Sequence, residues 1–275
     1  MNPVSLNSLI DFLEKNASPR DLLRLHAAVG DNKAKLELLN HYSKLQLPSG
    51  AFSYQFQNRN PPSLMHSYRA YLLLKELGYS ELTHDLIKQL VQFLESSQRI
   101  DGSWIEDHQL LAISGLPPWM DPHNKNVEIL TTAYCCTIMT IEDPSSLVTQ
   151  KALKYLKQHR NFDGTFAGFP HTTWIAGAIF MGYYGTFNVT GREMVSIIDD
   201  LLDQDHPGST IQWITSSLLL FGFKPQTLPL LSRALDILEK RQQSDGLWSS
   251  EDEGRQIETT VDCLITLHKG RRINW

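Results

Sequence analysis

The segments SSQRIDGSW (residues 96–104) and KRQQSDGLW (residues 240–248) share one pattern, in which a glutamine precedes an Asp-Gly turn and a tryptophan follows it. Glycine readily adopts the positive φ that a tight turn requires, and an aspartate side chain accepts backbone N–H bonds around the turn. We expect the glutamine and the tryptophan to tie the preceding helix to its neighbour, by a polar contact and by aromatic burial. We interpret these turns as structural.

Related glycine turns recur along most of the chain, at Gly50, Gly102, Gly164, Gly208 and Gly246, with intervals of 52, 62, 44 and 38 residues. Each follows an amphipathic helical pattern and precedes a helical pattern with few charges. A polar helix followed by a buried helix, repeated five times, predicts an all-α fold, an αα toroid (barrel) of about five to six helical hairpins. An open solenoid is the alternative, because repeats alone do not specify closure.

The repeats occupy residues 30–270 of what we expect to be a single αα-toroid domain over residues 1–275. Residues 1–29 contain two shorter helical patterns, which we expect to supply the ring-closing hairpin.

Composition excludes several classes of protein. The chain has 25 Lys and Arg against 30 Asp and Glu, a net charge of −5, so no nucleic-acid partner is expected. The sequence shows no transmembrane segment and no signal peptide, and its three cysteines are too few for a disulfide framework. We therefore predict a cytoplasmic protein, whose oligomeric state the sequence does not indicate.

The two Gln-to-Trp turns resemble the QW-type repeats of the terpenoid cyclase and protein prenyltransferase superfamily, and HRNFDGTF (residues 159–166) is a weakened copy. The resemblance covers roughly residues 30–270 and implies the αα-toroid fold. Class II terpene cyclases carry a DxDD motif whose central aspartate is the Brønsted acid. In the matching stretch here, Glu128 stands at the first aspartate, while Leu130 and Thr131 replace the next two, so the motif is not intact.

Two metal-binding patterns of the superfamily were compared with the sequence. The Asp-x-Cys zinc pair of prenyltransferases is absent, since Asp262 and Cys263 are adjacent. A string like the magnesium-binding DDxxD of class I terpene synthases occurs at Asp199, Asp200 and Asp203. Because it ends an amphipathic helix, we interpret it as a solvated acidic helix end, with a magnesium site as the alternative.

Polar residues near the starts of the buried helices are the candidate catalytic groups. Counted back from the glycines that follow these helices, His66, His171 and Glu258 occupy comparable positions, and Glu128 lies near the start of another. We expect these four to act as acid/base groups, since burial shifts such pKa values toward neutrality. One alternative is a 2-His-1-carboxylate iron site formed by His66, His171 and Glu258. Another is that they only cap and hydrogen-bond their helices.

Aromatic residues near these positions are the candidate substrate-binding groups, because aromatic faces stabilise carbocations. They are Tyr68, Tyr134, Trp174, Trp213 and Trp119, the last in the long irregular stretch 105–126. Packing in the core is the alternative role for each.

Together these features predict a terpenoid-cyclase-like enzyme that binds an apolar, isoprenoid-class small molecule in a central cavity. The expected reaction is acid/base cyclisation or isomerisation without an intact DxDD motif. The cofactor stays open between none, magnesium and iron. A metal-dependent enzyme on the same scaffold and a non-catalytic lipid-binding or interaction toroid are the alternatives.

Overall fold

The structure is a computed structural model that describes residues 6–78 and 80–274. The regular secondary structure of these residues is helical, apart from three isolated β-bridges, which confirms the predicted all-α class. The α-helices are α1 (Leu6–Asn16), α2 (Pro19–Ala28), α3 (Asn32–Leu45), α4 (Leu64–Leu77), α5 (Glu81–Ser97), α6 (Lys125–Glu142), α7 (Leu147–Gln158), α8 (Pro170–Tyr184), α9 (Val189–Leu202), α10 (Gly208–Leu220), α11 (Pro229–Lys240) and α12 (Gln256–Lys269), and the short 3-10 helices are η1 (Tyr54–Phe56), η2 (His108–Ala112) and η3 (Pro118–Met120).

Amphipathic and buried helices alternate along the chain, as the repeats predict. In α8, every residue from 172 to 181 is buried, whereas α7 buries only one face, at spacings of three and four residues. The same contrast holds between α11 and α12. A helix buried on most sides must be covered by its neighbours, so α4, α6, α8, α10 and α12 form the core of their hairpins.

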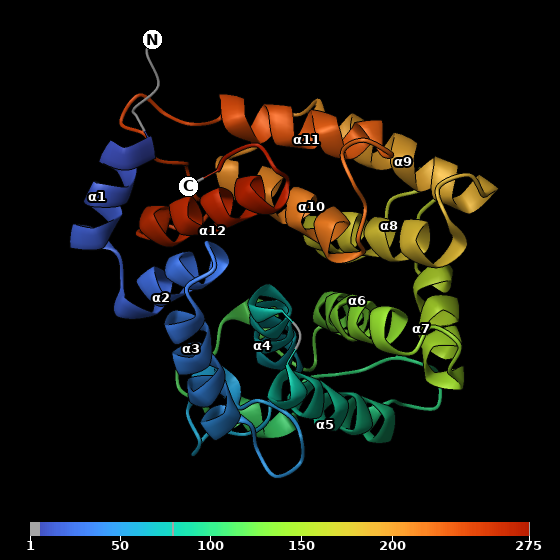
Figure 1. Cartoon of the computed structure of the whole chain (residues 1–275). Helices are drawn as coiled ribbons and strands as arrows, with labels where there is room; N and C mark the ends of the chain where they lie inside the picture. Colours follow the sequence, from blue (N-terminus) through green and yellow to red (C-terminus); the bar gives the residue numbers. More distant parts are fainter. Residues whose placement is uncertain (1–5, 79, 275) are drawn as a thin grey trace. The chain divides into compact units, whose positions relative to one another are not determined.

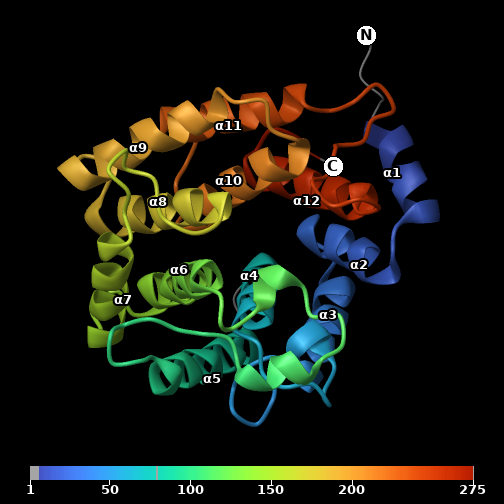
Figure 2. The ribbon, with the colours of Figure 1, turned by 180° about the vertical axis from the view of Figure 1, so that it is seen from behind.

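The chain forms two compact units, Leu39–Ile197 and Met1–Leu38 with Ile198–Trp275. In the first unit α6 packs between α4 and α8, while α5 lies against α4 and α6, and α7 against α6 (Figure 1). In the second unit α12 packs against α2, α10 and α11 (Figure 2). The single-domain organisation over residues 1–275 stays a prediction.

The Gln-to-Trp turns hold neighbouring helices together. Gln98 donates from Nε2 to the carbonyl of Gly102 in its own turn, at 3.1 Å, and to the carbonyl of Val148 on α7, at 2.9 Å. Trp104 is fully buried, and its Nε1 donates to the carbonyl of Leu94 at 2.9 Å. These are the polar contact and the aromatic burial expected from the sequence.

Four of the five turns also fix the register of the buried helix that follows. Two residues after each turn glycine, a backbone N–H donates to a hydroxyl on that helix. The pairs are Phe52 to Ser67 on α4, Trp104 to Thr132 on α6, Phe166 to Thr173 on α8, and Trp248 to Thr260 on α12. Gly208 is the exception: it is the first residue of α10 and not a turn glycine. A Cβ at position 208 would lie 2.9 Å from the Cβ of Trp248, so close packing explains this glycine.

Replacing Gly102 by alanine is expected to lower the free energy of unfolding by about 3 kcal/mol, because strain and a backbone clash add. Its φ is 92°, and a Cβ there would lie 2.5 Å from the carbonyl oxygen of Lys151. Gly115 is the matched control, since its φ is 75° but no atom lies within 4 Å of its Cβ position. Urea unfolding of both variants tests this, and equal losses would contradict the role given to close approach.

Candidate functional site

A buried polar chain lies at the start of α4. Ser63 is the N-cap, and its Oγ accepts the backbone N–H of His66 at 3.2 Å. The carboxylate of Glu106 accepts the N–H groups of Leu64 and Met65, at 2.9 and 2.8 Å, and the hydroxyl of Ser63 at 3.1 Å. The same hydroxyl oxygen lies 3.1 Å from Nδ1 of His66. Glu106, Ser63 and His66 thus form one continuous hydrogen-bonded chain.

Burial shifts the pKa values of Glu106 and His66 in opposite directions. Glu106 is 1% exposed, and its burial raises the carboxyl pKa to about 7, although the three hydrogen bonds it accepts oppose the shift. His66 is 7% exposed, and burial, followed by the nearby charge of Arg69, lowers its pKa to about 4. Neighbouring groups with pKa values moved so far from their usual ranges are typical of functional sites.

Aromatic rings surround the imidazole. Tyr54 and Phe56 of η1 meet the His66 ring edge-on, with centroids 5.0 and 5.5 Å away. Gln55 and Phe56 have φ values of 54° and 55°, a left-handed conformation that costs non-glycine residues free energy. We call Tyr54, Phe56, Ser63, His66 and Glu106 the His66 cluster.

Two of the predicted substrate-binding aromatics contact each other. The rings of Tyr68 on α4 and Tyr134 on α6 are stacked, with centroids 4.3 Å apart. Burial raises the pKa of Tyr134 to about 12 and that of Tyr68 further, so both phenols stay protonated at neutral pH. Tyr68 is buried and Tyr134 half-buried, and each ring covers one face of the other.

His171 and Trp174 also lie together, at the start of α8, with ring centroids 4.8 Å apart. However, the turn hydroxyls place His66 in a different register from His171 and Glu258. His171 precedes Thr173 and Glu258 precedes Thr260 by two residues, whereas His66 directly precedes Ser67, a difference of about 100° around a helix. Counting back from the glycines missed this for two reasons. The helix α8 continues past Gly182 to Tyr184, and the count itself does not fix the register, since His66 and Glu258 both precede their glycines by 12 residues.

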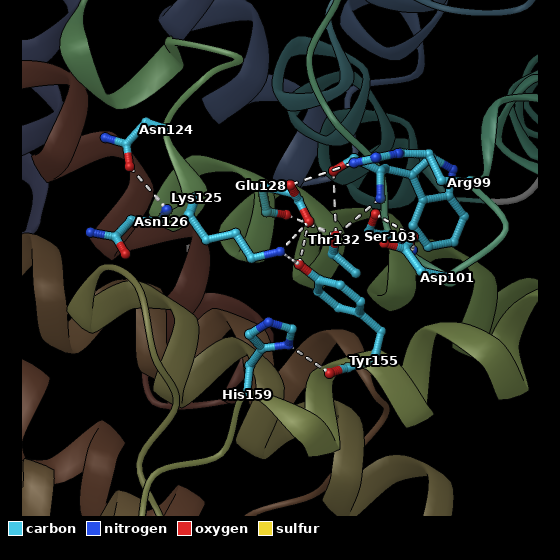
Figure 3. A network of polar contacts seen from close by, with 11 residues as sticks. Arg99, Asp101, Ser103, Asn124, Lys125, Asn126, Glu128, Thr132, Tyr155 and His159 are labelled. Carbon is cyan, nitrogen blue, oxygen red and sulfur yellow. Dashed lines mark hydrogen bonds and ion pairs between the residues drawn. The ribbon is translucent and has the colours of Figure 1, made fainter.

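Glu128 is held by cations (Figure 3). It accepts from Nζ of Lys125 at 2.7 Å and from the hydroxyl of Tyr155, and Arg99 lies 3.6 Å away. Burial opposes ionisation, but the bonds from Lys125 and Tyr155 outweigh it, and the pKa of Glu128 is lowered. An ionised carboxylate is a poor proton donor, so this environment does not suit Glu128 to the role of the acid, and a role as a base stays a prediction.

Glu258 lies in a second ionic network, between α2 and α12. It pairs with Arg20 at 3.5 Å and with Arg255 at 3.3 Å, and next to it Arg24 donates to Asp262 at 2.7 Å. Cations and carboxylates alternate in this network, so its charges are largely compensated. Its main effect is to join two helices that are far apart in the sequence.

Replacing Arg24 by methionine is expected to lower the free energy of unfolding by about 2 kcal/mol, since Asp262 would lose its closest cation. The Arg24 side chain is only 9% exposed. Arg20→Met is the control, because that side chain is 41% exposed and its ion pairs are longer, so a loss below about 1 kcal/mol is expected. Thermal unfolding in low and high salt measures both, and a larger loss at Arg20 would contradict this ranking.

The remaining predicted residues are spread over other elements. Trp213 is half-buried on α10, and Trp119 on η3 is 50% exposed. Their roles in binding stay predictions. Asp199 is half-buried and Asp203 exposed, and both accept from Arg233. The solvated interpretation of the acidic string stays a prediction.

In residues 6–78 and 80–274, no group of three or more His, Cys, Asp or Glu side chains is arranged to hold a metal ion. All three cysteines are buried free thiols, and burial raises the pKa of Cys136 to about 12. Thiols in this state are poor nucleophiles.

Sequence reasoning missed Glu106, although one signal was available. An acidic residue also follows the second Gln-to-Trp turn, where Glu251 lies three residues after Trp248. Glu251 bonds the hydroxyl of Thr210 near the start of α10, as Glu106 bonds that of Ser63 at α4. A carboxylate after such a turn therefore reaches the start of the preceding buried helix.

Comparison with known proteins identifies the family. Residues 20–224 match the prenyltransferase alpha-alpha toroid domain. Among solved structures, the apo type II terpene cyclase MstE from Scytonema is similar with a TM-score of 0.60 and 13% identity, over 96% of this chain and 97% of that chain. At this identity the similarity concerns the fold alone. No curated protein matches the sequence.

Within the described residues, no helix has both the length and the apolarity needed to cross a bilayer. The alternation of amphipathic and buried helices, the turns that join them and the match over most of the sequence agree with one another. The chain belongs to the prenyltransferase alpha-alpha toroid domain family, and its fold is the all-α αα toroid.

Proposed function

We propose that this protein is a terpenoid-cyclase-like enzyme that cyclises or isomerises an apolar, isoprenoid-class small molecule by acid/base chemistry. The observation that carries the proposal is the buried His66 cluster on α4, with the rings of Tyr54 and Phe56 against the imidazole, on a helix that also contributes Tyr68 to a stacked pair with Tyr134. The imidazole of His66 supplies a proton-transfer group. The aromatic rings supply faces that stabilise a developing positive charge. Fold similarity to a type II terpene cyclase supports the substrate class.

The experiment is mass-spectrometric product analysis after incubation with linear isoprenoids and their diphosphates, with and without magnesium. We expect an isomeric product that retains any diphosphate and forms without magnesium. His66→Gln is expected to lower kcat by about 100-fold or more, which is typical for loss of an acid/base group. His84→Gln, on the exposed face of α5, is the control and should keep wild-type turnover.

Two outcomes would contradict the proposal. Release of diphosphate only with magnesium would favour the acidic string of Asp199, Asp200 and Asp203 instead. Full turnover by His66→Gln would show that the His66 cluster takes no part in the reaction.

We further propose a cytoplasmic location, because three free thiols are typical of a reducing compartment.

A further inference from the structure

We propose that Ser63 relays a proton between Glu106 and His66, so that Nε2 of His66 can be presented to the substrate either with or without a proton. The use of this relay in catalysis rests on the proposed function. Its existence rests only on the geometry of the His66 cluster.

The geometry gives one hydroxyl proton two possible acceptors. Oγ of Ser63 lies 3.1 Å from Oε1 of Glu106 and 3.1 Å from Nδ1 of His66. A hydroxyl carries one proton and can donate to only one of them at a time. The direction of these two hydrogen bonds is therefore set by whether Glu106 or Nδ1 of His66 carries a proton.

Each direction fixes a tautomer of His66. When Glu106 is ionised, Ser63 donates to the carboxylate, so Nδ1 of the neutral imidazole must carry a proton to bond Ser63, and Nε2 has a lone pair. When Glu106 is protonated, it donates to Ser63, Ser63 donates to Nδ1, and the imidazole proton is on Nε2. The first state makes Nε2 a base and the second makes it a donor.

The proton count balances over a reaction cycle. As the substrate takes the Nε2 proton, Nδ1 takes the hydroxyl proton of Ser63, and Ser63 takes the proton of Glu106. Glu106 becomes a carboxylate, and the substrate gains one positive charge. When the cation later loses a proton to Nε2, the three transfers reverse. No proton is consumed, as cyclisation and isomerisation require, and no co-reactant is needed.

The surroundings favour a change of tautomer over a change of charge. On α4, Arg69 disfavours a second cation at His66, and the rings of η1 are uncharged. Around Glu106 the neighbours are Asp107 and the thiol of Cys135 on α6, which burial keeps protonated. The pKa of Glu106, about 7, places the exchange in the neutral range.

The α10 hairpin contains a matched site without the relay. There Glu251 bonds the hydroxyl of Thr210 and its backbone N–H bonds that of Ser209, with no histidine at the equivalent position. If carboxylates after the turns only cap helices, replacing Glu106 and replacing Glu251 should have similar effects.

The test is ¹⁵N NMR of the whole chain with labelled histidine, between pH 5.5 and 8.5 and without substrate. We expect His66 to stay neutral while its protonated nitrogen changes from Nε2 to Nδ1 with a midpoint near pH 7. Glu106→Gln and Ser63→Ala should abolish the change, Ser63→Thr should restore it by returning the hydroxyl, and Glu251→Gln should leave it intact. One fixed tautomer in the wild type, or an unchanged exchange in Ser63→Ala, would overturn the relay.

Turnover separates this inference from the function it serves. With a substrate identified by product analysis, Ser63→Ala should lower kcat about 100-fold and change KM little, with recovery in Ser63→Thr. Tautomer exchange without isomeric product would leave the relay standing and contradict the proposed function. Isomeric product without tautomer exchange would support the proposed function and contradict the relay.

Discussion

Replacing Trp104 by alanine is expected to lower the free energy of unfolding by about 3–5 kcal/mol, the usual cost of removing a large buried aromatic side chain. The indole is 0% exposed and lies where the turn after α5 meets α6. Its Nε1 donates to the carbonyl of Leu94 on α5 at 2.9 Å. The alanine variant therefore creates a cavity and removes the donor of that bond.

Guanidinium unfolding measures this loss, and two further variants separate its parts. Trp104→Phe keeps most of the volume but lacks the N–H donor, so a smaller loss, about 1–2 kcal/mol, is expected. Trp119→Ala is the control, because that indole is 50% exposed on η3 and should cost less than about 1 kcal/mol. Equal losses for Trp104→Ala and Trp119→Ala would show that the turn tryptophan does not hold the hairpin together.

The fold was predictable because its repeated features are local. Gln98 finds the carbonyl of Gly102 four residues away, and the left-handed φ of Gly102 follows from its place in the turn. The burial pattern of each helix is also a local property of the sequence. Gly208 was misassigned because the reason for it, contact with Trp248, is forty residues further along the chain.

The candidate site was predictable only in part, because it depends on pairings across the chain. Tyr68 and Tyr134 were each expected from their helices, but their stacking is a contact between α4 and α6. Glu128 was expected to be an acid/base group, but the partners that lower its pKa, among them Tyr155 on α7, come from other elements and could not be read from its own helix. Glu106 looked like an ordinary loop residue, because only its burial gives it an altered pKa.

The opposite pKa shifts of Glu106 and His66 predict an unusual pH dependence of stability. Glu106 has a pKa of about 7 in the folded chain against 4.5 ordinarily. Between these values the folded state holds a proton that the unfolded state has released, so stability is lost as pH rises. His66 has a pKa of about 4 against 6.5, so between these values the unfolded state binds the extra proton, and stability is lost as pH falls.

The two effects are similar in size and oppose each other between pH 4.5 and 6.5. Each shift spans about 2.5 pH units, or about 3 kcal/mol. In the wild type, these two groups together should therefore contribute little to the slope of the free energy of unfolding against pH. Relative to the wild type, Glu106→Gln should gain about 2 kcal/mol of stability as pH rises across this two-unit interval, because only the His66 effect remains. His66→Gln should lose about as much over the same interval.

Urea unfolding at half-unit pH steps measures the slope of the free energy of unfolding against pH. Slopes are compared between variants, so that the contributions of the carboxyl groups that all variants share cancel. The double variant Glu106→Gln with His66→Gln is the control, and its slope should return to that of the wild type. Because the two side chains are linked through Ser63, coupling will make the single effects less than additive. Slopes of the same sign in both single variants would contradict the opposed shifts, and with them the electrostatic basis of a relay that works near neutral pH.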